Sequence, residues 1–252
     1  DSSWSDADNW VSGVPASSPE TQILLNTTVR PDPVVDLNDP WELGRLDFGA
    51  AAGTFHLTGN TIRLTPSEGA ITADIYSITE NTTHRIDNDL DLNGNARIET
   101  AASASLMELY SAINLNEHTL EVKPQASTTT LTRGRIYLHG DITGSGNVVY
   151  ESSSMSHVYI YGNNTYTGGT SLTRGERYIY SDQAFGTGVL EIGVSVFTDL
   201  VAQDGVRTLD NDIRITGTVA SNHQLRFRGD GWILNGDITL ESGSGQMWSY
   251  TD

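Results

Sequence analysis

Three short stretches of this sequence decide its fold: Arg135-Ile136-Tyr137-Leu138, His157-Val158-Tyr159-Ile160-Tyr161 and Arg177-Tyr178-Ile179-Tyr180. Each alternates between apolar and other side chains and is rich in β-branched or aromatic residues, which predicts a β-strand. The tyrosines at 137, 159 and 178 occupy equivalent places and follow one another after 22 and then 19 residues. A pseudo-repeat of about 20 residues predicts one coil of a parallel β-helix.

Similar alternating runs recur along the chain between turn clusters rich in Gly and Asn, at 61–65, 90–92, 119–122, 212–216 and 237–240. Leu106, Leu109 and Ile113 have helical spacing, but the stretch 104–115 lacks convincing helix caps, so we predict strand there too. The chain is therefore expected to be all-β, a parallel β-helix of about 11 coils. At about 4.8 Å between strands it would span about 50 Å.

The stretch 1–40 is less regular, with Trp4 and Trp10 followed by several prolines. An uncapped solenoid would expose a hydrophobic section and a free strand edge. We therefore predict an irregular N-terminal cap over residues 1–40, followed by the coils of one continuous β-helix domain over 41–252. The opening Asp1-Ser2-Ser3-Trp4 is typical of a mature or excised start, so we expect a fragment of a longer protein.

The charge composition argues against two classes of binding partner. Acidic residues outnumber basic ones by 32 to 14, which gives a formal net charge of −18, and Lys123 is the only lysine. Such a surface repels nucleic acid and anionic lipid, so we predict neither as a partner. No apolar run is long enough to cross a bilayer, so no membrane insertion by this segment is expected. The chain has no cysteine, hence no disulfide and no thiolate metal site.

A longer motif lies in the middle of the chain: residues 162–170 read Gly-Asn-Asn-Thr-Tyr-Thr-Gly-Gly-Thr, and residues 184–188 read Ala-Phe-Gly-Thr-Gly. With the Gly-rich stretch 140–147 upstream, this pattern resembles the passenger-associated transport repeat, or autotransporter-associated β-strand repeat, of bacterial autotransporter passengers. The strong match covers residues 140–192. The resemblance implies a right-handed β-helix (solenoid), a bacterial source, and export to the cell surface or the medium. Gly168 and Gly169 would let the chain turn tightly between faces.

One stretch, Asp89-Leu90-Asp91-Leu92-Asn93-Gly94, matches the first half of a calcium-binding loop. The twelfth position of such a loop needs a bidentate glutamate, but it falls on Thr100, and Glu99 misses it by one. The leucines alternate with the acids as in a half-buried strand, so a strand is favoured over a metal site. Asp89, Asp91 and Asn93 are the calcium candidates, and no other cofactor is predicted.

The tyrosines are the most suggestive feature for binding. If Ile136, Leu138 and their equivalents point inward, the outward-facing residues on adjacent coils are Tyr137, Tyr159, Tyr161, Tyr178 and Tyr180. An aromatic stripe of this kind can stack against sugar rings, while Arg135, Arg177 and Glu176 hydrogen-bond the sugar hydroxyls. The alternative is that neighbouring tyrosines, which are good strand formers, stack on one another for stability.

The function expected from these patterns is that of a non-catalytic structural or adhesive segment of an extracellular or cell-surface bacterial protein. Its partners would be glycans or a host or neighbouring cell surface, and an exposed last coil would favour end-to-end self-association. One alternative is a polysaccharide lyase or hydrolase, which needs carboxylates converging in a groove. Close acid pairs exist, but no signature of those enzymes frames them. The other alternative is a carbohydrate-binding module, which needs an exposed, flat tyrosine stripe.

Overall fold

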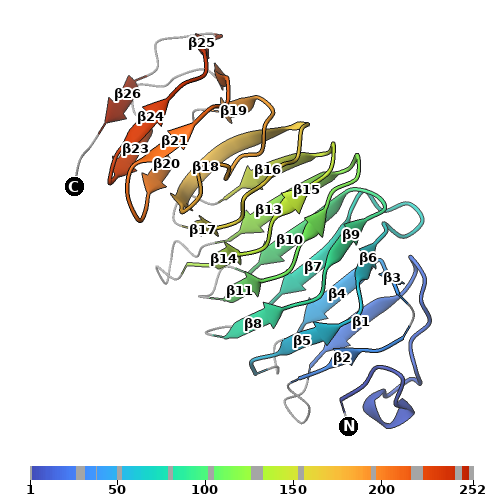
Figure 1. Ribbon diagram of the computed structural model, residues 1–252. Helices are drawn as coiled ribbons and strands as arrows, with labels where there is room; N and C mark the ends of the chain where they lie inside the picture. Colours follow the sequence, from blue (N-terminus) through green and yellow to red (C-terminus); the bar gives the residue numbers. More distant parts are fainter. Residues whose placement is uncertain are drawn as a thin grey trace.

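The computed structural model describes residues 2–26, 32–37, 39–49, 53–78, 82–101, 105–125, 133–152, 156–193, 197–216, 224–241 and 246–249. Figure 1 shows short strands stacked along one axis, each turn lying beside the next. All pairings between the named strands are parallel. Among the described residues there is no α-helix, and one 3-10 turn spans Ala7–Asn9. The predicted all-β parallel solenoid is confirmed.

Each turn contributes strands to up to three faces. The first face stacks β1 (Gln22–Leu25), β4 (Arg45–Phe48), β7 (Ala73–Ser77), β10 (Ala96–Thr100), β13 (Thr119–Pro124), β16 (Asn147–Glu151), the start of β18 (Gly169–Ile179), β19 (Leu190–Gly193), β22 (Ile213–Thr216) and β25 (Ile238–Leu240). The second stacks β2 (Val34–Val35), β5 (His56–Gly59), β8 (Thr83–Ile86), β11 (Leu106–Leu109), β14 (Arg135–Leu138), β17 (His157–Ile160), the end of β18, β20 (Phe197–Ala202), β23 (Gln224–Gly229) and β26 (Gln246–Ser249). Shorter strands form the remaining sheets: β3 (Trp41–Leu43), β6 (Ile62–Leu64), β9 (Leu90–Leu92), β12 (Ile113–Asn114) and β15 (Ile142–Thr143) in one, and β21 (Arg207–Leu209) with β24 (Trp232–Leu234) in another.

The repeat is longer and less regular than the sequence predicts. On the first face, successive strands are offset by as few as 20 residues, from Thr170 to Leu190, and by as many as 29, from Arg45 to Asp74. The connections between strands vary in length while the strand pairing is kept. Each of the two longer faces stacks ten strands of the described chain, fewer than the predicted count of about 11 coils.

Inward-facing side chains form columns along the axis because successive strands pair in register. Ile75, Ile98 and Val122 occupy one such column, and all three are buried. Full burial of an aliphatic side chain contributes about 1.5–3 kcal/mol. Since each turn is covered by the turns on either side, stability is shared between neighbours, as in other repeat proteins. Strand was predicted for 104–115 despite the helical spacing of Leu106, Leu109 and Ile113. The described part of this stretch contains the strands β11 and β12, and position 104 lies outside the described residues.

The N-terminal end is closed by tryptophans. Trp4 is buried and meets the edges of Trp10 and Trp41, with ring centroids 5.6 and 4.7 Å away. The Trp10 Nε1–H donates to the carbonyl of Trp4. Parallel pairing also involves residues of the stretch 1–40: β1 pairs with β4, and Ser3 forms an isolated parallel bridge with Val34. No helix in the described part of the chain is long and apolar enough to span a membrane.

The two halves of the central motif lie on adjacent turns and interlock. Tyr166 is buried, its hydroxyl contacts the hydroxyl of Thr170, and Thr170 donates to the carbonyl of Phe185. The backbone N–H of Thr187 donates to the carbonyl of Tyr166 at 2.9 Å. A side chain at Gly168 would lie 2.4 Å from the Gly146 carbonyl oxygen, and Gly169 has a φ of +126°. The tight turn predicted at Gly168 and Gly169 is therefore confirmed.

Candidate functional site: a tyrosine face bordered by arginines

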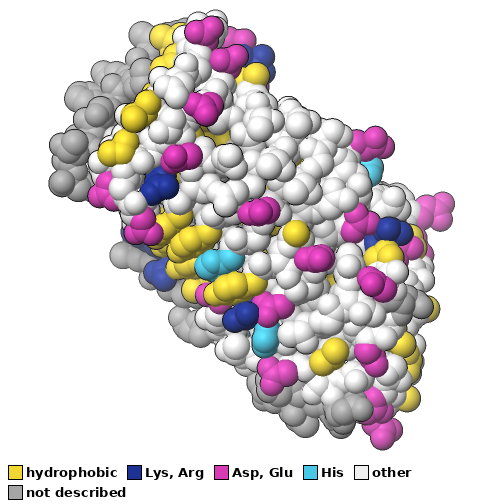
Figure 2. All heavy atoms as spheres, viewed as in Figure 1, with side chains coloured by type: hydrophobic (Ala, Val, Ile, Leu, Met, Phe, Trp, Pro, Cys, Tyr) yellow, Lys and Arg dark blue, Asp and Glu magenta, His cyan; other side chains and the backbone are white. Residues whose placement is uncertain are grey.

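Two aromatic ladders run along the second face, across β11, β14, β17 and β18. In the first, the ring of Tyr159 lies between Tyr137 and Tyr178, with centroids 4.1 and 4.7 Å away. The second ladder contains Tyr110, His139, Tyr161 and Tyr180, with successive centroids 4.1, 4.5 and 4.1 Å apart. We call these two ladders the tyrosine face. Figure 2 shows it as a band of hydrophobic and histidine side chains with basic side chains beside it.

The five predicted tyrosines do point outward, and the structure brings them together. Their rings stand face to face along the axis, so Tyr159 and Tyr161 have an aromatic neighbour on each ring face. The ladder therefore presents ring edges and hydroxyl groups rather than open ring faces. Stacking of the tyrosines on one another, the alternative weighed from the sequence, is what the geometry shows.

The hydroxyl groups of the ladder keep their protons. Partial burial raises the pKa of Tyr159, and the neighbouring Tyr137 raises it further. Burial and the hydroxyl of Tyr180 raise the pKa of Tyr161 in the same way. Tyr178 also has a raised pKa, from burial and from its hydrogen bond to Glu176. At neutral pH the hydroxyls of Tyr159, Tyr161 and Tyr178 are thus neutral O–H groups, which can donate and accept hydrogen bonds.

Arg135 is exposed at the start of β14 and pairs in register with His157. His157 is buried, and its Nε2 lies 2.9 Å from a guanidinium nitrogen of Arg133 and 3.5 Å from Glu176. Because the guanidinium can only donate, this Nε2 accepts, and Nδ1 carries the hydrogen toward the Tyr159 hydroxyl, 3.3 Å away. Burial lowers the pKa of His157, consistent with a neutral ring.

The prediction that Arg177 points outward is wrong. Its side chain is 0% exposed and lies inside the coil, in register with Val158. Position 177 alternates with the outward-facing Tyr178 and therefore points inward. A β-bulge lies nearby: Tyr150 pairs with Leu172 but Glu151 with Arg174, which leaves Thr173 as an extra residue in β18. The guanidinium of Arg177 donates to the Tyr150 carbonyl at 2.6 Å and to the Gly175 carbonyl at 2.9 Å. Burial lowers the pKa of Arg177 to about 9. It is a structural residue of the bulge.

A charge cluster that the sequence analysis missed adjoins the ladder. Asp199 on β20 is 0% exposed, and its carboxylate accepts two hydrogen bonds from Arg226, at 2.6 and 2.5 Å. A third comes from Arg228 at 3.1 Å. The parallel register places Asp199 beside both Glu176 and Arg226. Nothing within a few residues of Asp199 signals this cluster, because its partners are one turn away in the sequence.

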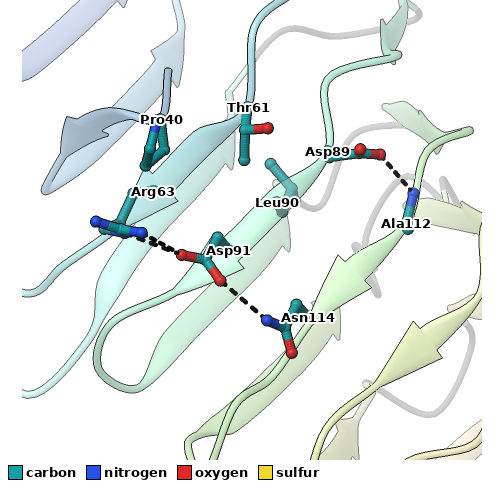
Figure 3. Close-up of a pocket in the computed structure, with 8 residues that line it drawn as sticks. All are labelled: Pro40, Thr61, Arg63, Asp89, Leu90, Asp91, Ala112 and Asn114. Carbon is teal, nitrogen blue, oxygen red and sulfur yellow. Dashed lines mark hydrogen bonds and ion pairs between the residues drawn. The ribbon is translucent and has the colours of Figure 1, made fainter. Parts of the chain in front are cut away.

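Two of the calcium candidates, Asp89 and Asp91, line an open depression of about 270 Å³ on the sheet of the short strands β6, β9 and β12. Figure 3 shows Asp91 between Arg63 and Asn114, while Asp89 turns toward Ala112. Asp91 is 2.9 Å from Arg63 and 3.1 Å from Asn114, and Asp89 accepts from the Ala112 N–H at 3.0 Å. Asn93 donates to the Thr65 hydroxyl at 3.4 Å.

The two carboxylates thus serve different partners, and one of them is already neutralised by an arginine. Calcium sites gather several oxygen ligands at 2.3–2.6 Å around one point. In the described part of the chain no group of three or more His, Asp or Glu side chains is placed to hold a metal ion. The strand that the sequence favours at 90–92 is present as β9.

Comparison of the chain with protein-family models, with curated proteins and with solved structures finds no match.

Proposed function

We propose that this chain is a non-catalytic structural segment of an extracellular or surface-displayed bacterial protein, of the kind found in autotransporter passengers, which extends from the cell and presents an adhesive face. The observation that carries the proposal is the ladder itself. Outward side chains of successive turns contact one another along the axis, as Tyr137, Tyr159 and Tyr178 do. This arrangement builds a continuous surface over several turns rather than a pocket in one of them.

Polar contacts between turns add to the same picture. The buried Asn164 accepts from the Ile142 N–H at 2.8 Å and donates to the Ala184 carbonyl at 2.7 Å, so it joins three turns. Arg97 reaches across to Glu121 on the next turn at 2.9 Å. Neighbour-to-neighbour bonding of this kind suits a long, thin protein that must stay rigid without disulfides. The interlocked motif of residues 162–170 and 184–188 supports the autotransporter resemblance, because both halves act in joining turns.

The location can be tested on intact cells of the source organism with antibodies raised against this chain. We expect the chain on the outer surface or in the medium, and external protease should remove the surface signal while a cytoplasmic marker survives. Detection of the chain only after lysis, protected from external protease, would overturn the proposal.

The competing enzymatic function is tested separately with the purified chain. It is incubated with plant, algal and bacterial polysaccharides, with and without calcium, and new chain ends are assayed. We expect none. Cleavage of any member of the panel would replace the structural proposal with that of a β-helix lyase or hydrolase.

A further inference from the structure

Three arginines stand apart from the rest of the charged surface. Among the described residues, the other basic side chains that face outward each lie within 4.0 Å of a carboxylate: Arg45 of Asp47, Arg63 of Asp91, Arg85 of Asp87, Arg97 of Glu121, Lys123 of Glu151, Arg207 of Asp182, Arg214 of Glu191, and Arg226 and Arg228 of Asp199. Arg133, Arg135 and Arg174 form no ion pair with a carboxylate of the described residues. The chain has a net charge of −18, so acidic side chains are in large excess. Three arginines that form no ion pair with a described carboxylate are therefore unusual.

The three arginines lie at one corner of the solenoid. Arg135 pairs in register with His157, and His157 pairs with Glu176 on the next turn. Arg133 precedes Arg135 by two residues, and Arg174 precedes Glu176 by two, so the side chains of both strands share the outward face. Arg135 and Arg174 are exposed, and Arg133 is half-buried against His157. We call Arg133, Arg135 and Arg174 the arginine corner.

The acids near this corner are engaged elsewhere. Glu176 accepts the hydroxyl hydrogen of Tyr178 at 2.8 Å and lies 3.5 Å from His157. Glu151, which pairs in register with Arg174, turns to Lys123 at 3.4 Å. In the sequence, residues 126–132, 153–155 and 194–196 include no Asp or Glu. The guanidinium groups of the corner are therefore available to an anion from outside.

We propose that the arginine corner and the edge of the tyrosine face together bind an anionic polysaccharide that carries carboxylate or sulfate groups. The guanidinium groups supply the planar, paired donors that carboxylate and sulfate accept. The hydroxyls of Tyr137, Tyr159 and Tyr161 lie along the axis and exchange hydrogen bonds with sugar hydroxyls. A ligand of repeating units matches a site whose groups repeat from turn to turn. The inference rests on the adhesive role proposed above and names its ligand class.

The same geometry disfavours single-stranded nucleic acid, the other common repeating anion. Proteins that bind single strands stack the bases on open aromatic faces. Here Tyr159 has an aromatic ring on each side, and Tyr161 lies between His139 and Tyr180. Sugar hydroxyls, by contrast, need only the exposed edges.

The test measures binding of the purified chain to polygalacturonate, to dextran sulfate and to neutral dextran by affinity electrophoresis and calorimetry. We expect binding to at least one acidic polymer, weakening as salt is raised, and none to neutral dextran. The triple variant R133Q/R135Q/R174Q should bind at least about tenfold more weakly. The double variant Y161F/Y180F, which keeps the rings, should bind several-fold more weakly.

The matched control is R45Q/R63Q/R214Q, which removes the same charge from arginines that already have carboxylate partners. Its affinity should equal that of the unaltered chain, and circular dichroism should show that all variants keep the β-fold. Equal loss in the two triple variants, absence of binding to both acidic polymers, or equally tight arginine-dependent binding of single-stranded DNA would each overturn the inference. Surface display is measured independently on cells, so failure here leaves that result unchanged.

Discussion

The ring of Tyr159 lies flat on the ring of Tyr137, with centroids 4.1 Å apart and planes 4° from parallel. The two residues are register partners in the β14–β17 pairing, so the parallel ladder of backbone bonds fixes the distance between their rings. Tyr178 continues the column with a centroid distance of 4.7 Å. Stacking of this kind requires aromatic side chains at equivalent positions of successive turns, and it joins turns outside the apolar core.

Removal of the central ring should therefore weaken two turns at once. Each aromatic pair contributes about 0.5–1.5 kcal/mol beyond the area it buries. We expect Tyr159→Ala to lower the free energy of unfolding by about 1–3 kcal/mol, seen as a lower midpoint of urea denaturation. Tyr159→Phe keeps both stacks and should remain within about 0.5 kcal/mol of the unaltered chain. Equal losses in the two variants would mean that the hydroxyl, not the stack, stabilises this face.

The sequence predicted the ladder because its cause is local and repeated. Period-two alternation places 137, 159 and 178 outward, and their spacing places them on adjacent turns. Arg177 shows where the same reasoning failed. Alternation with Tyr178 already requires position 177 to point inward, but a charged residue was expected outside. Local spacing does not reveal the acceptors of its guanidinium, the carbonyls of Gly175 and Tyr150 beside the bulge at Thr173.

The charge cluster around Asp199 and the length of the repeat could not be predicted from the sequence, for a related reason. The partners of Asp199 lie 27 and 29 residues further along, and no rule of local spacing connects them. The offsets between turns vary with the connecting segments, so a repeat measured over two turns did not give the number of turns. Local sequence patterns determine where each strand forms. Which side chains become neighbours on adjacent turns depends on how the turns stack.

Arg177 offers a test of the bulge. Two effects oppose each other in Arg177→Met: the buried charge is removed, which is favourable, but the carbonyls of Gly175 and Tyr150 lose their donors. The Thr173 hydroxyl, at 3.4 Å from the Tyr150 carbonyl, is too distant to replace the guanidinium. We expect the orphaned carbonyls to dominate, at about 1–3 kcal/mol of lost stability. The midpoints of urea denaturation of Arg177→Met and of the unaltered chain test this prediction. A variant more stable than the unaltered chain would contradict the role of Arg177 in satisfying these carbonyls.

A matched change at the same position separates packing from hydrogen bonding. Arg177→Ala removes the same donors and also leaves a cavity in the column between Val158 and Leu200. Large-to-small changes in a core cost about 2–5 kcal/mol, so the alanine variant should be clearly less stable than the methionine variant.

His84 should make the stability depend on pH. Its ring is buried, stacks on Phe48 with centroids 4.3 Å apart, and accepts the Phe55 N–H at Nδ1. Burial lowers the pKa of His84 to about 4, against about 6.5 in the unfolded chain. Between these values the unfolded chain binds more protons than the folded one. Stability is therefore fully present above pH 6.5 and is lost as pH falls toward 4, by about 3 kcal/mol in total.

The comparison that isolates this histidine uses His84→Gln, which cannot titrate. Other groups change both proteins alike, so the difference in unfolding free energy between them reports His84 alone. We expect the unaltered chain to lose about 3 kcal/mol relative to the variant between pH 7 and pH 4. A difference that stays constant over this range would show that the ring is protonated without cost in the folded state.

Asp199 carries the last prediction. Its carboxylate is fully buried and receives hydrogen bonds from Arg226 and Arg228, whose own side chains are 25% and 29% exposed. Asp199→Asn keeps the shape but turns one acceptor oxygen into a donor that faces an arginine, and leaves two guanidinium groups without their counter-charge. Breaking a buried ion pair from one side costs about 3–5 kcal/mol.

Asp182→Asn is the control, because Asp182 is 52% exposed and 3.5 Å from Arg207, and such surface pairs contribute about 0–1 kcal/mol. Urea denaturation should place Asp199→Asn well below Asp182→Asn. Equal midpoints would mean that solvent reaches the Asp199 carboxylate and screens it, and the cluster would then be a surface feature rather than the element that anchors β23 to β20.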